Sequence, residues 1–275
     1  MKILCEEELP CNQVWKFQAD HGLLSTGPNH MTSRFGVAFQ FLTILPLFEA
    51  REFSSRDLAR SMAAFPLVGL ALGGGLLVFH LLLGRHMPGA LEGAVLVALL
   101  AWATGAFHLD GVADTVDGLA GGWTRERALE IMKDSRTGAV GAAALVLVIL
   151  VKSLGLGLLP ASVLPLAILV TPAVARGSVV WMAHGSTYAR PAGGLGTPYT
   201  EHLDAATVQW ALLGSGLPCL LLGWRGLVAF AATLAYTAWL KRRFHARLGG
   251  ITGDVLGFAE ETGEILFLLA LHIMY

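Results

Sequence analysis

The sequence predicts an all-α protein, a polytopic integral membrane helical bundle with about six or seven transmembrane helices. Three observations predict it: the composition, a series of apolar runs near 20 residues long, and an uneven distribution of positive charge between these runs. Of the 275 residues, 55% are hydrophobic and only 14% are charged, and the mean hydropathy is +0.62. About a quarter of the residues of a typical soluble domain are charged. The composition therefore places the chain among membrane proteins.

Residues 1–30 differ in kind from the rest of the chain. They contain an acidic triplet, Glu6-Glu7-Glu8, and no continuous apolar core, so they do not form a signal peptide. We expect residues 1–30 to be either a disordered leader or a segment that results from a translation start assigned too early. A single transmembrane domain is expected over residues 31–275. The three cysteines, Cys5, Cys11 and Cys219, have neither disulfide nor zinc-site spacing, and we expect free thiols.

Seven apolar runs are candidate membrane spans, and an eighth segment is too short. The short segment, Phe35–Phe48, contains Pro46 and is more typical of an interfacial or re-entrant helix. The seven spans are Phe65–Leu83, Gly89–Leu109, Gly138–Leu159, Ala161–Ala183, Ala205–Gly223, Gly226–Leu240 and Val255–Met274. The glycines within the first of them, among them Gly69, Gly73, Gly74 and Gly75, are more typical of close helix packing than of phosphate binding.

Positive charge is concentrated in alternate connections between these spans. One set of connections contains only Arg85 and Arg225. The other set contains Arg51, Arg56, Arg60, Arg125, Arg127, Lys133, Arg136, Arg190, Lys241, Arg242, Arg243 and Arg247. The bias predicts that the second set faces the cytoplasm, as expected for an inner-membrane protein. The sequence contains no basic stripe interleaved with aromatic residues, so we expect lipid and not nucleic acid as a partner.

The stretch His108–Gly118 contains three carboxylates at the end of a predicted span. Spacings of four and three residues bring Asp110, Asp114 and Asp117 within roughly 60° of arc on one helical face. Converging negative charges at a membrane surface require a cation, and Mg²⁺ prefers carboxylate oxygens. The alternative is a solvated helix cap, which the helix dipole disfavours at the carboxyl end of a span. We therefore expect a magnesium site.

Two further charged blocks lie on the same predicted side of the membrane. Asp134 is a further candidate metal ligand, and Lys133 and Arg136 either grip phosphate oxygens or are ordinary positive flanking residues. Asp254 follows a glycine-rich turn, where it either contacts a ligand or caps a helix. The glycine-rich segment 188–196 contains Arg190 and is a candidate ligand-covering loop.

Charged residues also fall inside the predicted spans. Glu260, Glu261 and Glu264 need partners there, and Lys152 and Arg176 are the candidates. His108 lies about 160° from Asp110 on an ideal helix, so it points away from the three aspartates and is kept only as a candidate general base.

Several blocks together resemble one family, the cobalamin synthases, which are membrane-bound adenosylcobinamide-GDP ribazoletransferases. The matching blocks are Arg34 with Phe41–Pro46, Phe65–Gly69, His108–Gly118, Ile131–Gly141, Tyr188–Gly196 and Arg247–Glu264. The resemblance runs from about residue 34 to the C-terminus, and the order of the acidic blocks is its most specific feature.

The resemblance implies a Mg²⁺-dependent transferase domain. In this reaction the 5′ oxygen of α-ribazole, or of its 5′-phosphate, attacks the corrinoid-side phosphorus of adenosylcobinamide-GDP. The products are adenosylcobalamin, or its 5′-phosphate, and GMP. The implied catalytic and metal-binding residues are Asp110, Asp114 and Asp117, with Asp134, a fourth metal ligand, and Asp254 as their partners. The chemistry by itself suggests that an acid not saturated by the metal, such as Asp117, accepts the proton of the attacking hydroxyl. Substrate binding is assigned to Lys133, Arg136, Arg190 and Asp254, and the active site is expected to face the cytoplasm.

Two other functions are alternatives to this transferase activity. A CDP-alcohol phosphatidyltransferase also uses aspartates on membrane helices, but its Asp-Gly-x-x-Ala-Arg run is missing here, because neither Asp110-Gly111 nor Asp117-Gly118 continues in that way. An ion-coupled or proton-coupled transporter usually shows inverted repeats and polar sites at the midplane. The sequence shows no internal repeat, and its aspartates gather at one predicted membrane face.

Overall fold

The computed structural model describes residues 30–48, 54–194 and 196–275, and in these ranges the chain forms helices with no β-strand. The N-terminal half contains α1 (His30–Leu42), α2 (Ser55–Ser61), η1 (Met62–Ala64), α3 (Phe65–Leu82), η2 (Gly84–His86), α4 (Gly89–Ala103), α5 (Phe107–Gly121) and α6 (Arg125–Ile131). The C-terminal half contains α7 (Ala139–Gly157), α8 (Leu164–Ala183), α9 (Thr197–Glu201), α10 (Ala205–Gly216), η3 (Leu217–Leu222), α11 (Gly223–Leu248) and α12 (Gly253–Met274). The expectations for residues 1–29, including Cys5 and Cys11, lie outside the described residues. Cys219 is a free, buried thiol, as predicted.

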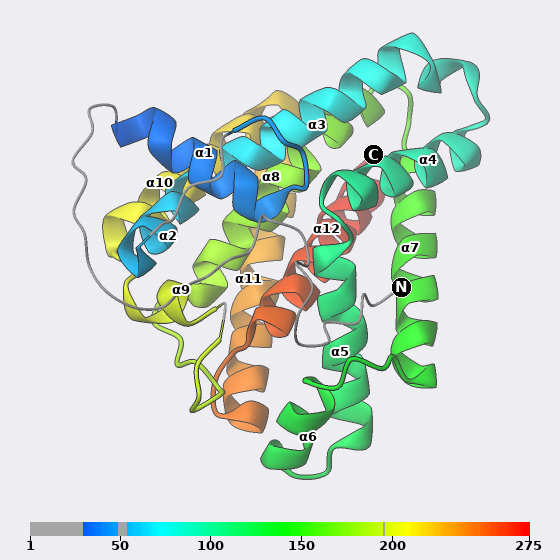
Figure 1. The fold of residues 1–275 in the computed structure, drawn as a ribbon. Helices are drawn as coiled ribbons and strands as arrows, with labels where there is room; N and C mark the ends of the chain where they lie inside the picture. Colours follow the sequence, from blue (N-terminus) through cyan, green and yellow to red (C-terminus); the bar gives the residue numbers. More distant parts are fainter. Residues whose placement is uncertain (1–29, 49–53, 195) are drawn as a thin grey trace.

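Helices α8 and α12 form the interior of the bundle (Figure 1). Helix α8 presents apolar residues on all of its faces, which is typical of a buried helix. In its most apolar stretch of 18 residues, 83% are buried. Helix α8 packs against α3, α10, α11 and α12, and α12 packs in addition against α5 and α7. The glutamates of α12 are therefore enclosed by other helices.

The all-α membrane fold is confirmed, with fewer clear spans than expected. By length and composition, four helical segments of the described chain are apolar enough to cross a membrane, or five if α4 and α5 count as one bent span. These segments are Ser55–His86, Ala139–Gly157, Leu164–Ala183 and Ala205–Leu248. The C-terminal helix α12 is not among them, since it contains three glutamates in its interior.

The prediction of one continuous span over Gly89–Leu109 is wrong. The chain bends by 94° between α4 and α5, because Gly105 and Ala106 adopt left-handed backbone angles with φ of 63° and 57°. The carbonyls freed at the break are paired: Ala103 accepts from the Ile44 N–H at 2.9 Å, and Ala101 from the Ala106 N–H at 2.7 Å. Asp110 consequently lies in the first turn of α5, where the helix dipole favours negative charge, and not at the carboxyl end of a span.

The segment predicted to be interfacial or re-entrant is α1 followed by non-helical chain. Helix α1 packs against α2 and α3, and residues 43–48 run past the break between α4 and α5. No membrane span passes through the segment within the described residues.

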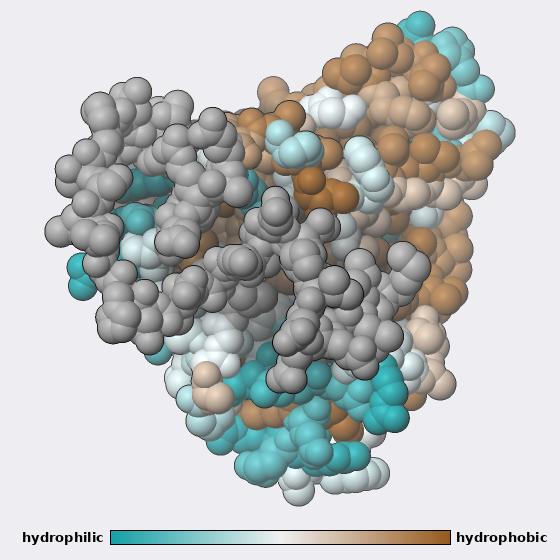
Figure 2. All heavy atoms as spheres, in the orientation of Figure 1, coloured by the Kyte–Doolittle hydropathy of each residue, from teal (hydrophilic) through white to brown (hydrophobic). Residues whose placement is uncertain are grey.

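The charged connections meet at one end of the bundle, which we call the charged end and define by residues 122–138, 184–194 and 249–252. Arg125 donates to the carbonyls of Leu248 at 2.6 Å and Ala189 at 2.9 Å, and Arg247 donates to the carbonyls of Gly122 and Trp123. Figure 2 shows hydrophilic side chains gathered at this end near α6, while apolar side chains cover α3, α4 and α7. The connections that carry Arg125, Arg190 and Arg247 therefore meet in the fold, whereas Arg56 and Arg60 lie on α2, which packs against α1 and α9, and Arg51 lies outside the described residues.

Two neighbouring glycines of α3 differ in the space around them. A Cβ at Gly73 would lie 2.3 Å from the Leu169 carbonyl of α8, whereas a Cβ at Gly74 meets nothing within 4 Å. We expect Gly73→Ala to lower the free energy of unfolding by about 1–3 kcal/mol, because α3 and α8 must separate. Gly74→Ala should be neutral or stabilising, since alanine favours the helix by about 1 kcal/mol. Thermal unfolding in detergent measures both, and equal melting temperatures for the two variants would contradict the predicted packing.

Candidate active site

Helix α5 presents the three aspartates that the sequence singled out. The helix is continuous over Phe107–Gly121, so Asp110, Asp114 and Asp117 share one face as predicted. Asp110 is exposed, Asp114 is 8% exposed and Asp117 is half-buried. The middle aspartate, Asp114, is thus the most buried of the three.

Asp117 joins α5 to the start of α7. Its Oδ2 accepts the N–H of Gly138 at 2.6 Å, and its Oδ1 accepts the N–H of Gly141 at 2.8 Å. These two amides are free at the amino terminus of α7, so the carboxylate satisfies donors that the helix itself leaves unpaired. This contact gives Asp117 a structural role that the sequence did not reveal, and its catalytic role stays a prediction.

Asp254 forms an ion pair with Arg190. The guanidinium Nη2 lies 2.6 Å from Asp254 Oδ2 and 3.4 Å from the Met132 carbonyl. Burial raises the pKa of Asp254, Arg190 opposes this rise, and the nearby negative charge of Asp110 adds to it. The charges of Arg190 and Asp110 therefore act on Asp254 in opposite directions.

The alternative interpretation of Asp254 as a helix cap is wrong. Thr252 is the N-cap of α12, and its hydroxyl accepts the Val255 N–H at 3.3 Å. Asp254 is consequently free to contact Arg190. The position of Arg190 follows from a short parallel bridge between Tyr188 and Ile251, which fixes the 188–194 segment against the turn before α12.

A close helix crossing brings Asp110 and Asp254 together. A Cβ at Gly111 would lie 2.7 Å from the Asp254 carbonyl, and a Cβ at Gly257 would lie 3.1 Å from the His108 carbonyl. Glycines on both sides thus allow the backbones of α5 and α12 to approach. The first turns of both helices meet here, and each carries an aspartate.

The remaining predicted residues lie on the segment between α6 and α7. Asp134 pairs with Arg136 in a bidentate contact with distances of 2.7–3.2 Å, and Lys133 and Arg136 are exposed. As the side chains stand, no group of three or more His, Cys, Asp or Glu residues within the described chain is close enough to hold a metal ion. The donor set still suits Mg²⁺, because Asp110, Asp114 and Asp254 offer only hard carboxylate oxygens.

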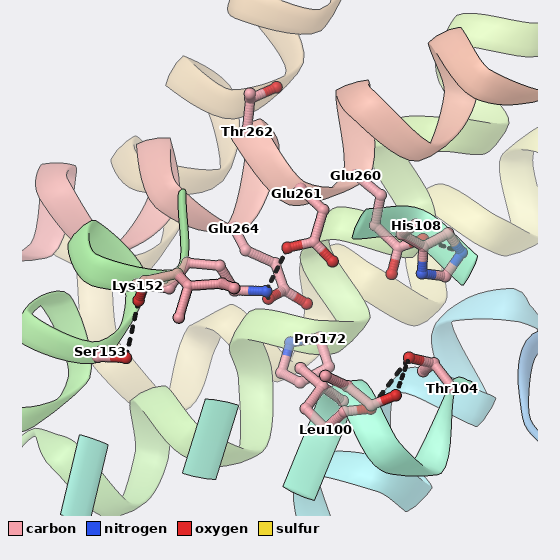
Figure 3. Close-up of polar contacts among 12 residues, drawn as sticks. Leu100, Thr104, His108, Lys152, Ser153, Pro172, Glu260, Glu261, Thr262 and Glu264 are labelled. Carbon is pink, nitrogen blue, oxygen red and sulfur yellow. Dashed lines mark hydrogen bonds and ion pairs between the residues drawn. The ribbon is translucent and has the colours of Figure 1, made fainter. Parts of the chain in front are cut away.

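The buried glutamates of α12 pair with the cations that the sequence suggested. Lys152 Nζ lies 2.6 Å from Glu261 Oε2 and 2.7 Å from Glu264 Oε2 (Figure 3). Arg176, 1% exposed, lies 3.0 Å from Glu260 Oε1. This prediction is confirmed.

His108 also belongs to the buried network. Its Nε2 lies 2.6 Å from Glu260 Oε2, so the imidazole points into the bundle and away from the three aspartates, as predicted. Because the network connects α5, α7, α8 and α12, it fixes the helix that carries the aspartates.

Sequence reasoning missed two groups of residues near the site. The distribution of charge predicts only a flanking role for Arg125 and Arg247. In the structure they donate to backbone carbonyls and so join the segments of the charged end. The aromatic side chains Phe41, Phe65, Phe107 and Tyr199 converge beside the crossing of α5 and α12. No spacing rule predicts either group, since their members come from different elements.

The structure defines a class of protein. It is a multi-pass helical membrane protein with a site of carboxylates and a guanidinium next to its charged end. A family model described as cobalamin-5-phosphate synthase matches residues 34–272. The chain belongs to this family of enzymes, as the resemblance predicted.

Individual relatives agree with the family match. The chain is similar to an adenosylcobinamide-GDP ribazoletransferase of Pseudomonas putida, with 42% identity over 87% of this chain and 98% of the relative. It is 41% identical to that of Syntrophobacter fumaroxidans, over 89% of this chain and 100% of the relative. It is 42% identical to that of Pseudomonas aeruginosa, over 86% of this chain and 96% of the relative. No solved structure matches the chain.

Proposed function

We propose that this protein is a Mg²⁺-dependent adenosylcobinamide-GDP ribazoletransferase of the inner membrane whose active site faces the cytoplasm. The observation that carries the proposal is the ion pair of Arg190 with Asp254 at the close crossing of α5 and α12, where the first turn of α5 carries Asp110. Carboxylates and a guanidinium in one place suit a diphosphate substrate and its metal ion. The names of the relatives supply the identity of that substrate.

The proposed reaction exchanges a phosphoanhydride bond for a phosphoester bond. A free ribose hydroxyl of α-ribazole, or of its 5′-phosphate, forms a bond to the corrinoid-side phosphorus of adenosylcobinamide-GDP. The 5′ oxygen expected above cannot be this nucleophile in α-ribazole 5′-phosphate, because it already carries the phosphate that the product keeps. The bond from that phosphorus to the bridging oxygen breaks, and GMP leaves with the electron pair. The hydroxyl proton passes to a base, for which the sequence suggested Asp117. Both Asp117 oxygens already accept backbone N–H groups, so Asp117 would act as this base only by giving up its contacts with the start of α7.

The residues of the proposed site and of the charged end divide the remaining tasks. Asp110, Asp114 and Asp254 would hold Mg²⁺, with Asp134 joining once its pairing with Arg136 opens. When bound, the ion neutralises charge on the diphosphate. Arg190 would hold a phosphate oxygen, and Lys133 and Arg136 would extend the positive surface from the neighbouring connection.

Release of GMP tests the proposal directly. Purified protein in detergent is given adenosylcobinamide-GDP, α-ribazole and Mg²⁺, and a parallel sample is given α-ribazole 5′-phosphate. We expect GMP and the joined corrinoid in equal amounts, no reaction in excess EDTA, and recovery when Mg²⁺ is restored. Full turnover in EDTA would overturn the magnesium requirement, and no GMP with either acceptor would overturn the activity itself.

A further inference from the structure

Helix α11 exposes an apolar face on the outside of the bundle. The helix belongs to the segment Ala205–Leu248, which is apolar enough to cross a membrane and is only 28% buried in its most apolar stretch of 18 residues. From Trp224 to Trp239 every exposed residue of α11 is apolar, and the exposed positions recur every three to four residues, which places them on one face. They are Trp224, Leu227, Val228, Ala231, Ala235 and Trp239. This face is therefore suited to contact with lipid.

Two arginines follow at the end of this face. Arg242 and Arg243 are the next exposed residues of α11, and Arg242 lies about 27 Å beyond Trp224 along the helix. The hydrocarbon core of a bilayer is about 30 Å thick, so the arginines lie near the level at which phospholipid headgroups begin. Trp239, 53% exposed, lies one turn before Arg243, and tryptophan is typical of the membrane interface. The order of apolar face, tryptophan and arginine thus matches the order of acyl chain, interface and headgroup in a lipid.

Neither arginine is paired with a carboxylate. Among the residues that the structure describes, no Asp or Glu forms an ion pair with Arg242 or Arg243. The Arg243 guanidinium lies over the Trp239 ring, 5.8 Å from its centroid. Lys241 and Arg247, from the same turns of α11, instead donate to backbone carbonyls of the charged end. Arg242 and Arg243 are therefore available to an external anion.

We propose that Trp239, Arg242 and Arg243 form a site for the headgroup of an anionic phospholipid. The negative charge of the headgroup complements the two guanidinium groups, and a guanidinium donates to phosphate oxygens through two N–H groups at once. The occupant is a lipid and not a soluble phosphate, because the apolar face before Trp239 contacts acyl chains that a soluble anion lacks. This site lies outside the proposed active site, and its existence does not depend on the proposed reaction.

Quenching of Trp239 by brominated lipid tests the site. The protein is reconstituted in phosphatidylcholine vesicles that contain an increasing fraction of brominated phosphatidylglycerol or, in parallel, of brominated phosphatidylcholine. The Trp239 signal is the difference between the fluorescence of the wild type and that of Trp239→Phe. We expect half-maximal quenching at an about 25-fold lower fraction of the brominated phosphatidylglycerol, because each arginine near an anionic membrane surface contributes about fivefold. Equal quenching by the two lipids would overturn the inference.

Charge variants distinguish this site from the general positive charge of the protein. Arg242→Gln and Arg243→Gln should each reduce the preference for phosphatidylglycerol about fivefold, whereas Arg242→Lys should keep most of it because the charge remains. The matched control is Arg127→Gln, which removes one charge from an exposed arginine of α6 and should leave the preference unchanged. A similar loss in Arg127→Gln, or no loss in the two α11 variants, would contradict the proposed site.

Inorganic phosphate tests the identity of the occupant. The preference for phosphatidylglycerol should persist when phosphate replaces chloride at equal ionic strength. If phosphate abolished it, a soluble anion would be the occupant, and the inference of a lipid site would be wrong. No substrate is present in these measurements, so their outcome leaves the GMP test of the proposed function unaffected.

Discussion

Replacement of Asp114 by Asn is expected to slow GMP release by about 10²–10³-fold, the loss typical of removing one electrostatic group from a reaction centre. Asp114 is the central member of the aspartate face of α5, and it is only 8% exposed. Its charge is therefore weakly screened by solvent, and asparagine keeps the shape while removing the charge. Single-turnover rates at saturating Mg²⁺ measure the effect.

A control separates this effect from general damage. Glu130→Gln removes the charge of an exposed carboxylate on α6 that pairs with Arg127 at 2.8 Å. Exposed pairs contribute about 0–1 kcal/mol, so activity and melting temperature should stay at wild-type values. Asp114→Asn with wild-type activity and unchanged magnesium dependence would remove Asp114 from the proposed site.

Replacement of Lys152 by Met is expected to lower the free energy of unfolding by about 3–5 kcal/mol. Lys152 is 3% exposed and lies between Glu261 and Glu264, so its loss leaves Glu261 without a cation and Glu264 with only Arg176, 3.8 Å away. A buried charge without a partner is strongly destabilising, although the intact pair adds little stability. Thermal unfolding in detergent at fixed pH measures the change.

Second-site changes test the same network. Adding Glu261→Gln to Lys152→Met removes the charge that has lost its cation and should recover part of the lost stability. Arg127→Met deletes the cation of an exposed pair and should have almost no effect. If Lys152→Met melted at the wild-type temperature, charge pairing would not hold α7 against α12.

Local chemistry in the sequence was enough to predict much of this protein. The apolar runs predicted the helical membrane fold, and the 4 and 3 spacing predicted that Asp110, Asp114 and Asp117 share a face. Charge inside apolar runs predicted the pairing of Lys152 and Arg176 with the α12 glutamates, because unpaired charges are costly there. Each of these features depends on the period of a helix or on the cost of burying charge, which the order of residues contains.

Only the tertiary structure decided how the segments meet. The break at Gly105 and Ala106 depends on distant residues such as Ile44, whose N–H pairs with a carbonyl that the break frees. Because of this break, Asp110 lies at the start of a helix and not at the end of a span. The capping of α7 by Asp117, the ion pair of Arg190 with Asp254 and the aromatic contacts of Tyr199 join side chains from separate elements. Sequence spacing reports neighbours along one helix, whereas the approach of different helices depends on the packing of the whole bundle.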